Sequence, residues 1–120
     1  MSKIGLTKAS FVIQCRSLEN ERVLKTVRGH TLYYRGHKLG IYRREHIGSK
    51  RQKYEYVLID LATGLAIAIR PRKIYLVEDM EHDRGEYLKG YLKIIEGDFY
   101  KKQVKEFSEM KKQGGPINEK

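Results

Sequence analysis

The chain has 120 residues, of which 40% are hydrophobic and 33% charged, and its net charge is +10 at pH 7. This length and balance fit one folded domain with its own core rather than a disordered chain. No apolar run approaches the roughly 20 residues of a membrane-spanning helix, and no secretory signal pattern begins the chain. Because Cys15 is the one cysteine, no internal disulfide is possible, and we expect a cytoplasmic protein.

The first half of the chain predicts β-strands. Residues 11–15 are a short candidate strand, and residues 19–27 fit either a strand or a helical turn. Residues 31–35 and 39–43 are rich in β-branched and aromatic side chains and flank a glycine-containing connection, so they predict a hairpin. Residues 48–50 indicate a loop.

The clearest hairpin pattern lies in the middle of the chain. It pairs Tyr54–Leu61 with Leu65–Ile69 around residues 62–64, where glycine permits the positive φ of a turn. Both faces of this pair are largely apolar, so we expect it to be central in the sheet. Pro71 has no N–H to donate and should end the second arm. Ile74–Val77 then predicts one more strand.

After these strands the pattern becomes helical. The acidic residues 78–83 suit the N-terminus of a helix, because carboxylates complement the helix dipole there. Apolar residues recur at helical spacing from Leu88 to Phe99, and a second helix should begin at Asp98. The expected fold is α+β, with a small antiparallel sheet of five or six strands, open or closed like a barrel, followed by one or two C-terminal helices. We expect residues 1–113 to form a single domain and residues 114–120 a flexible tail.

Positive charge is concentrated in the first two-thirds of the chain. Residues 1–77 carry 16 Lys or Arg and five carboxylates, whereas residues 78–120 carry nine and ten. Between Arg28 and Lys53, cations alternate with tyrosines and histidines. Cations contact phosphates, while rings and guanidinium planes stack on bases, so the mixture is typical of nucleic-acid binding. The predicted contact residues are Arg28, Arg35, Lys38, Arg43, Arg44, Lys50, Arg51, Lys53, Arg70, Arg72, Lys73, Tyr33 and Tyr42.

The sequence therefore predicts a non-enzymatic protein that binds RNA or single-stranded nucleic acid. No helix-turn-helix pattern for reading a duplex is present. Tyrosines on half-buried strands usually contribute to packing, so we expect a basic rim of turns to make most phosphate contacts. Tyr33 and Tyr34 are neighbours in a predicted strand and point to opposite faces, so at most one of them faces the ligand.

Patterns of catalytic and metal-binding residues are missing from the sequence. It contains no phosphate-binding glycine loop and no nucleophile elbow. The carboxylates of residues 78–83 are consecutive, so they diverge instead of converging on a metal. Cys15, His30, His37 and His46 are separated by 15, 7 and 9 residues, which matches no common zinc motif. A zinc site would need separate turns to meet, so we expect neither a metal nor a cofactor.

A second interpretation belongs to a different class of protein. A short basic chain without enzyme motifs also fits a small inhibitor or adaptor from a phage or mobile element, of the type that blocks host defence, such as an anti-CRISPR. Such a protein would bind in an acidic groove of a host protein, or to a nucleoprotein complex. Host partners that remain bound after RNase treatment would favour this interpretation. The oligomeric state stays open.

Overall fold

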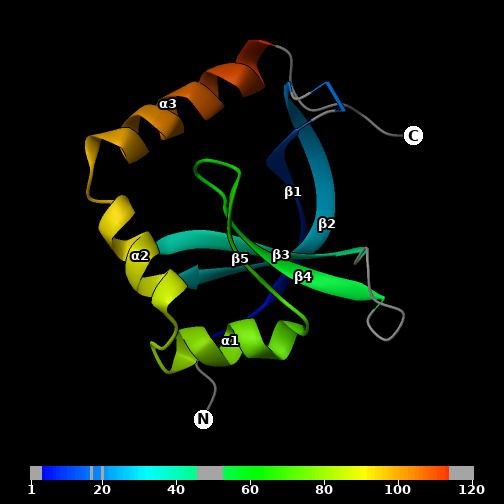
Figure 1. The fold of residues 1–120 in the computed structure, drawn as a ribbon, viewed down its shortest axis with the longest axis vertical. Coiled ribbons are helices and arrows are strands. Elements are labelled where there is room, and N and C mark those ends of the chain that lie inside the picture. Colours follow the sequence, from blue (N-terminus) through cyan, green and yellow to red (C-terminus); the bar gives the residue numbers. More distant parts are fainter. Residues whose placement is uncertain (1–3, 17, 20, 46–52, 114–120) are drawn as a thin grey trace.

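A computed structural model describes residues 4–16, 18–19, 21–45 and 53–113 and shows an antiparallel sheet followed by helices (Figure 1). This order confirms the expected α+β class. The elements are β1 (Thr7–Arg16), β2 (Arg22–Tyr34), β3 (His37–Glu45), β4 (Tyr54–Asp60), β5 (Leu65–Arg70), α1 (Lys73–Glu81), α2 (Glu86–Ile94) and α3 (Asp98–Gln113). None of the helices in these described ranges is long and apolar enough to cross a membrane.

Each strand pairs with the next one along the chain, so the sheet order is β1-β2-β3-β4-β5. The β2–β3 hairpin turns at Arg35 and Gly36, whose φ angles of 49° and 82° are the positive values that a tight two-residue turn requires. Gly64 has a φ of 72° in the β4–β5 turn, where the sequence predicted a glycine turn. The predicted loop at residues 48–50 lies outside the described residues.

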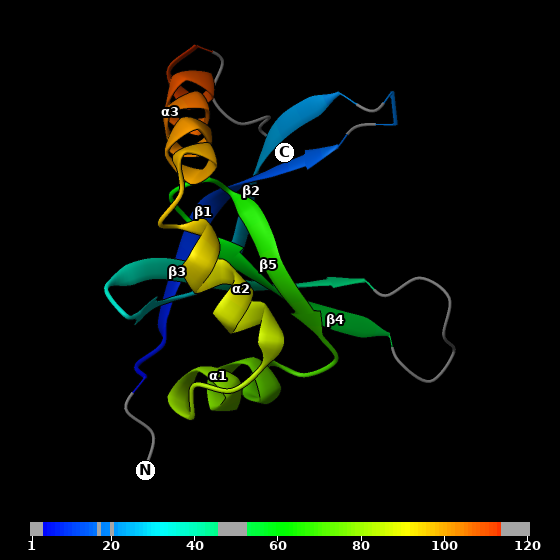
Figure 2. The ribbon, with the colours of Figure 1, turned by 60° about the vertical axis from the view of Figure 1, so that its left-hand side comes forward.

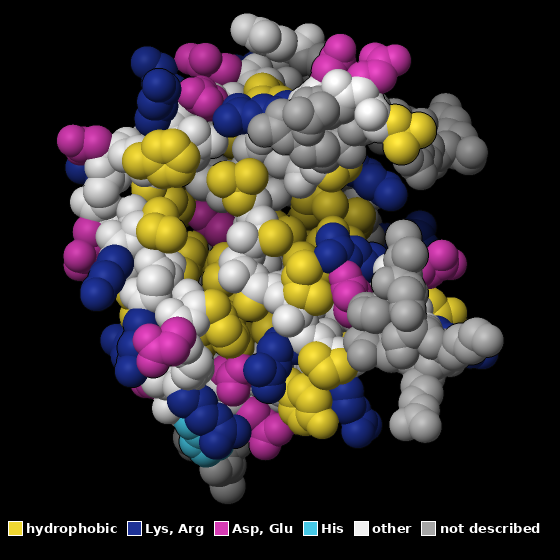
Figure 3. Space-filling view, viewed as in Figure 1, with side chains coloured by type: hydrophobic (Ala, Val, Ile, Leu, Met, Phe, Trp, Pro, Cys, Tyr) yellow, Lys and Arg dark blue, Asp and Glu magenta, His cyan; other side chains and the backbone are white. Residues whose placement is uncertain are grey.

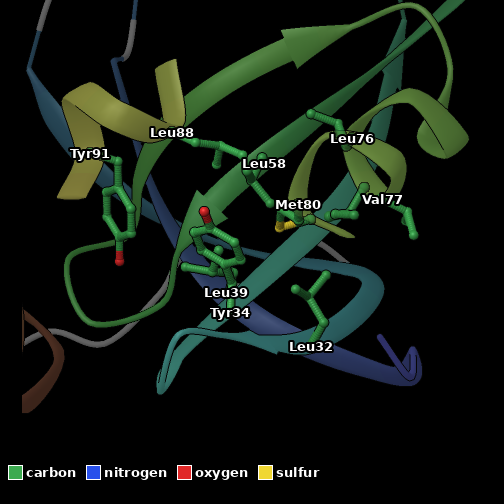
Figure 4. Close-up of a cluster of buried hydrophobic side chains, with 10 residues drawn as sticks. Leu32, Tyr34, Leu39, Leu58, Leu76, Val77, Met80, Leu88 and Tyr91 are labelled. Atoms are coloured by element: carbon green, nitrogen blue, oxygen red, sulfur yellow. The ribbon is translucent and has the colours of Figure 1, made fainter. Parts of the chain in front are cut away.

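One hydrophobic cluster joins the sheet to α1 and α2. Burial of these side chains supplies the main attraction between the two layers, because it removes apolar surface from water. In two views the three helices follow one another along one side of the sheet (Figures 1 and 2). The cluster is drawn in Figure 4 and includes Leu32, Tyr34, Leu39 and Leu58 of the sheet, Leu76, Val77 and Met80 of α1, and Leu88 and Tyr91 of α2.

A second cluster forms on the opposite face, where the sheet curls and β1 folds over β3 and β4. Its buried members are Phe11, Ile13, Val57 and Ile59. The Phe11 ring lies over Gly40, where an added Cβ would come within 2.7 Å of the ring. The Gln14 N–H donates a hydrogen bond of 2.8 Å to the Gly64 carbonyl oxygen, which ties β1 to the β4–β5 turn. Within the described residues the edge strands β1 and β5 do not pair, so the sheet stays open.

The predicted strand at Ile74–Val77 is wrong, because these residues lie in α1. Four consecutive apolar residues are too few to show whether their period is that of a strand or of a helix. Leu76 and Met80, one helical turn apart, both reach the core, and this tertiary burial decides the conformation. The acidic residues 78–83 consequently lie in the second half of α1 and in the short connection that precedes α2.

The hairpin predicted in the middle of the chain is confirmed as β4 and β5, and β5 ends one residue before Pro71. The pair is not central as a whole, since β4 lies between the two clusters while β5 is an edge strand. The apolar residues that recur at helical spacing from Leu88 to Phe99 belong to two separate helices. The first of them ends at Ile94, and the next begins at Asp98, as the sequence predicted.

Candidate nucleic-acid interface

Arginine and tyrosine side chains alternate across three strands and onto α1. Arg43 on β3 is opposite Tyr56 on β4, and Tyr56 is opposite Arg70 on β5. Partners directly opposite in a sheet point to the same face. The Arg43 guanidinium carbon lies 4.2 Å from the centre of the Tyr54 ring, and that of Arg70 lies 5.3 Å from the Tyr75 ring of α1. Each guanidinium is therefore paired with an aromatic ring.

Two adjoining hollows of about 230 and 430 Å³ lie beside this row and share Tyr56 and Lys73 as lining residues. None of the described residues that line either hollow is acidic. We give the name basic–aromatic surface to a selected set of basic and aromatic residues of the hollows and of the row, from which Tyr42 is excluded because its side chain lies on the other face of β3. Its members are Arg28, His30, Arg43, Lys53, Tyr54, Tyr56, Arg70, Arg72, Lys73 and Tyr75.

The cations of the basic–aromatic surface differ from several other cations of the chain in their partners. Arg35 forms a salt bridge of 3.0 Å with Asp83, and Arg44 pairs with Glu55. In the part of the chain that the structure describes, no carboxylate forms a salt bridge with a cation of the basic–aromatic surface. The Nε of Arg70 is buried and has no hydrogen-bond partner among the described residues. Among the described residues, no salt bridge therefore neutralises the positive charge of this surface.

The local backbone brings β2 and β3 unusually close beside this surface. Gly29 is opposite Tyr42 of β3, and a Cβ at this glycine would lie 2.1 Å from the Ile41 carbonyl oxygen. The neighbours of this glycine in the sequence, Arg28 and His30, both line the smaller hollow. Their placement against β3 thus depends on a position where only glycine fits.

His30 lies among cations that disfavour its protonated form. Its pKa is lowered from the usual value by burial, and further by the positive charges of Lys73 on α1 and Lys8 on β1. Arg28 and Arg43 line the same hollow. A bound anion in this hollow would favour the imidazolium and act in the opposite direction.

The structure gathers six of the eleven predicted cations on one surface: Arg28, Arg43, Lys53, Arg70, Arg72 and Lys73. Some of these, such as Arg28 and Arg43, lie within strands and not in turns. Lys50 and Arg51 lie outside the described residues.

The other predicted contact residues of the described ranges lie outside this surface, although Tyr42 contributes to the lining of the smaller hollow. Tyr33, Arg35 and Lys38 are at the β2–β3 turn, and five residues of extended strand place Lys38 about 17 Å from Arg43. Arg44 and Tyr42 are on the opposite face of β3 from Arg43. The Tyr42 ring packs edge-on against Phe11 at a centroid distance of 6.4 Å, and burial raises the pKa of its hydroxyl.

The four residues weighed as zinc ligands are dispersed or undescribed. Cys15 is near the end of β1, His30 lines the smaller hollow, and His37 packs edge-on against Tyr91 at 6.0 Å. His46 lies outside the described residues. No three His, Cys, Asp or Glu side chains gather in the described ranges in a way that could hold a metal ion.

Tyr54, Tyr56 and Tyr75 belong to this surface but were not among the predicted contacts. The sequence assigned the first two to a buried central strand and the third to a strand that is in fact α1. One signal was available, because Tyr54 and Tyr56 alternate along a strand and directly follow Lys53. Strand alternation places both rings on one face. Whether this is also the face of Arg43 depends on the register between β3 and β4. That register could not be predicted from the sequence.

A comparison of the chain with protein-family models, curated proteins and solved structures found no significant match. The chemistry of the basic–aromatic surface is therefore the basis on which a function can be argued.

Proposed function

We propose that this protein binds RNA or single-stranded nucleic acid through the basic–aromatic surface, without catalysing a reaction. The observation that carries the proposal is the cross-strand row of Arg43, Tyr56 and Arg70, which continues onto α1 through Tyr75. Guanidinium groups and rings in alternation suit a ligand that carries phosphates and bases in alternation.

Phosphate binding is supported by the start of α1 and by cations that form no salt bridge among the described residues. The first backbone N–H groups of a helix have no partner within the helix and favour an anion. Arg72 precedes α1 without making a side-chain cap, and the first turn of the helix contains no acidic residue. Arg72 and Lys73 thus place two cations beside the first backbone N–H groups of α1, at the edge of the larger hollow.

A preference for single strands is supported by the exposed rings. Tyr54 retains 42% and Tyr75 retains 37% of its accessible surface, so both can meet an unpaired base. A base in a duplex is stacked on its neighbours and offers no free face. Stacking of a base on an aromatic side chain contributes about 1–3 kcal/mol.

A salt titration tests this proposal. With a single strand of about 12 uridines, a length within the span of one small domain, we expect binding at low salt that weakens as salt rises. If five cations contact phosphates, the logarithm of the association constant should fall by about 3.5 per tenfold increase in salt. An RNA duplex of equal length should bind more weakly. Fluorescence anisotropy of labelled strands would measure both affinities.

Two results of this titration would contradict the proposal. The first is no binding to single-stranded RNA, single-stranded DNA or duplex at low salt. The second is binding with a salt slope near zero, because contacts to phosphates release counterions and must depend on salt.

The position of His30 predicts that the affinity for RNA depends on pH. The pKa of His30 is lowered in the free protein, and a bound phosphate would raise it, so binding is coupled to uptake of a proton. The affinity should therefore rise as pH falls from about 7.5 to about 5.5. NMR titration of the His30 ring should show a midpoint below the usual pKa without RNA and a higher midpoint with the uridine strand.

Two variants separate this effect from a general response to pH. His30→Gln should remove most of the pH dependence of binding. His82→Gln should retain it, because His82 follows α1 and lines neither hollow. An unchanged His30 midpoint in the presence of saturating RNA would show that no phosphate approaches this side chain.

A further inference from the structure

A separate cavity of about 360 Å³ lies between β5, α2 and the start of α3. In the space-filling view it appears as a hollow in which hydrophobic side chains surround a recessed acidic surface (Figure 3). It shares no lining residue with the two hollows of the basic–aromatic surface. Its volume is within the range of small-molecule sites.

The acidic group of this cavity is Asp60, which is only 3% exposed. Its carboxylate accepts hydrogen bonds from the Ala62 N–H at 3.2 Å and the Thr63 hydroxyl at 3.1 Å, which fixes it in the β4–β5 turn. The two oxygens of a carboxylate can together accept about four hydrogen bonds. In the described part of the chain Asp60 forms no salt bridge. A buried carboxylate without a cation is unfavourable, so this site favours a positive ligand.

Two tyrosine hydroxyls lie near this carboxylate. Tyr91 is 6% exposed, and its hydroxyl has no hydrogen-bond partner among the described residues. Figure 4 shows this hydroxyl at the edge of the aliphatic cluster and directed away from it. Burial and the neighbouring Asp60 raise the pKa of Tyr91, and the same causes raise that of Tyr100 to about 12. Both hydroxyls therefore stay neutral and supply no charge to the site.

Aromatic rings form much of the remaining wall. Tyr87, Tyr91, Phe99 and Tyr100 line the cavity, and no Lys or Arg is among its described lining residues although the chain carries a net charge of +10. The negative faces of aromatic rings attract organic cations, most strongly when water is excluded. Rings around one buried carboxylate are the arrangement that recognises an ammonium group.

We propose that this cavity binds an organic ammonium group carried on a small apolar body. Asp60 supplies the opposite charge, and the rings of Tyr91, Phe99 and Tyr100 surround the alkyl groups on the nitrogen. The ligand is either a free small molecule or a methylated lysine side chain of another protein, since both present the same chemistry.

Methyl NMR spectra of the full chain test this proposal, because Ile67 and Ile94 line the cavity and report on its occupant. The probes are choline and 3,3-dimethylbutan-1-ol, which have the same shape and differ in one positive charge. Choline should shift both methyl signals and bind at least about tenfold more tightly than the neutral alcohol. Potassium chloride at the same ionic strength serves as the salt control.

Substitutions in and outside the cavity test whether choline binds there. Asp60→Asn keeps an acceptor for the turn and should weaken choline at least about tenfold, as should Tyr100→Leu, which removes a ring. The matched control is Tyr33→Leu, a change of the same type at a side chain that is 65% exposed and outside the cavity. It should leave choline binding unchanged.

A peptide with trimethyllysine, compared with its unmodified form, distinguishes the two sources. Binding of choline alone assigns the cavity to a free small molecule, and preferential binding of the methylated peptide assigns it to a protein ligand. The proposal is overturned if neither probe shifts the Ile67 and Ile94 methyls, or if the neutral alcohol binds as tightly as choline. These results do not depend on RNA binding, so this proposal and the proposed function can fail separately.

Discussion

Replacing Arg28, Arg43 and Lys73 together by glutamine is expected to weaken binding to single-stranded RNA about 100-fold at about 0.1 M salt. Each phosphate contact on a single strand contributes about 0.7 to the slope of log K against log salt, so the loss of three should also reduce the slope by about 2. These side chains line one hollow and form no salt bridge with a described carboxylate. Anisotropy titrations at several salt concentrations measure both quantities.

A second triple variant provides the matched control. In this variant glutamine replaces Arg22, Arg35 and Lys38, which removes the same formal charge from positions outside the basic–aromatic surface. Arg22 pairs with Glu106 and Arg35 with Asp83, so much of their charge is already neutralised. Affinity should fall only slightly. If both triple variants weaken binding equally, net charge and not this surface determines binding.

Gly29→Ala is expected to destabilise the fold by about 3 kcal/mol, since the new methyl group meets backbone and not a movable side chain. The Cβ would lie 2.1 Å from the Ile41 carbonyl oxygen, so β2 and β3 must separate where they pair. The midpoint of thermal unfolding should fall by about 10 °C. Circular dichroism during heating and denaturant titration would measure this change.

Gly90→Ala is the control for this substitution. Gly90 lies inside α2, where an added Cβ meets nothing within 4 Å. Alanine is favoured over glycine in a helix interior, so this variant should gain about 1 kcal/mol. A Gly29→Ala protein as stable as the unmodified chain would show that β2 and β3 do not approach closely at this residue.

The sequence predicted those parts of the fold that depend on local signals. Gly64 in a turn and Pro71 after a strand act through their own backbone, so the β4–β5 hairpin was placed correctly. The strand predicted at Ile74–Val77 failed because four apolar residues carry no decisive period. The contacts of Leu76 and Met80 with the sheet are tertiary, and no local pattern contains them.

The candidate site was predictable in kind but not in geometry. The excess of cations in the first two-thirds of the chain is visible in the sequence, and it indicated a polyanion. The alignment of Arg43, Tyr56 and Arg70 depends on the registers of two strand pairs. A shift of one residue in either pair would move a ring to the other face. The cavity around Asp60 needs three elements in place, and nothing in the sequence predicted it.

The stacking of Arg43 on Tyr54 and of Arg70 on Tyr75 has a consequence for the selectivity of the surface. A free arginine side chain loses up to about 2 kcal/mol of rotamer freedom when a ligand fixes it. Here the rings already restrict two guanidinium groups in the unbound protein. If this surface binds a polyanion as proposed, binding therefore has a smaller entropic penalty, and the spacing between the two groups is set in advance. Such a rigid template would distinguish polyanions by the distance between their charges as well as by charge density.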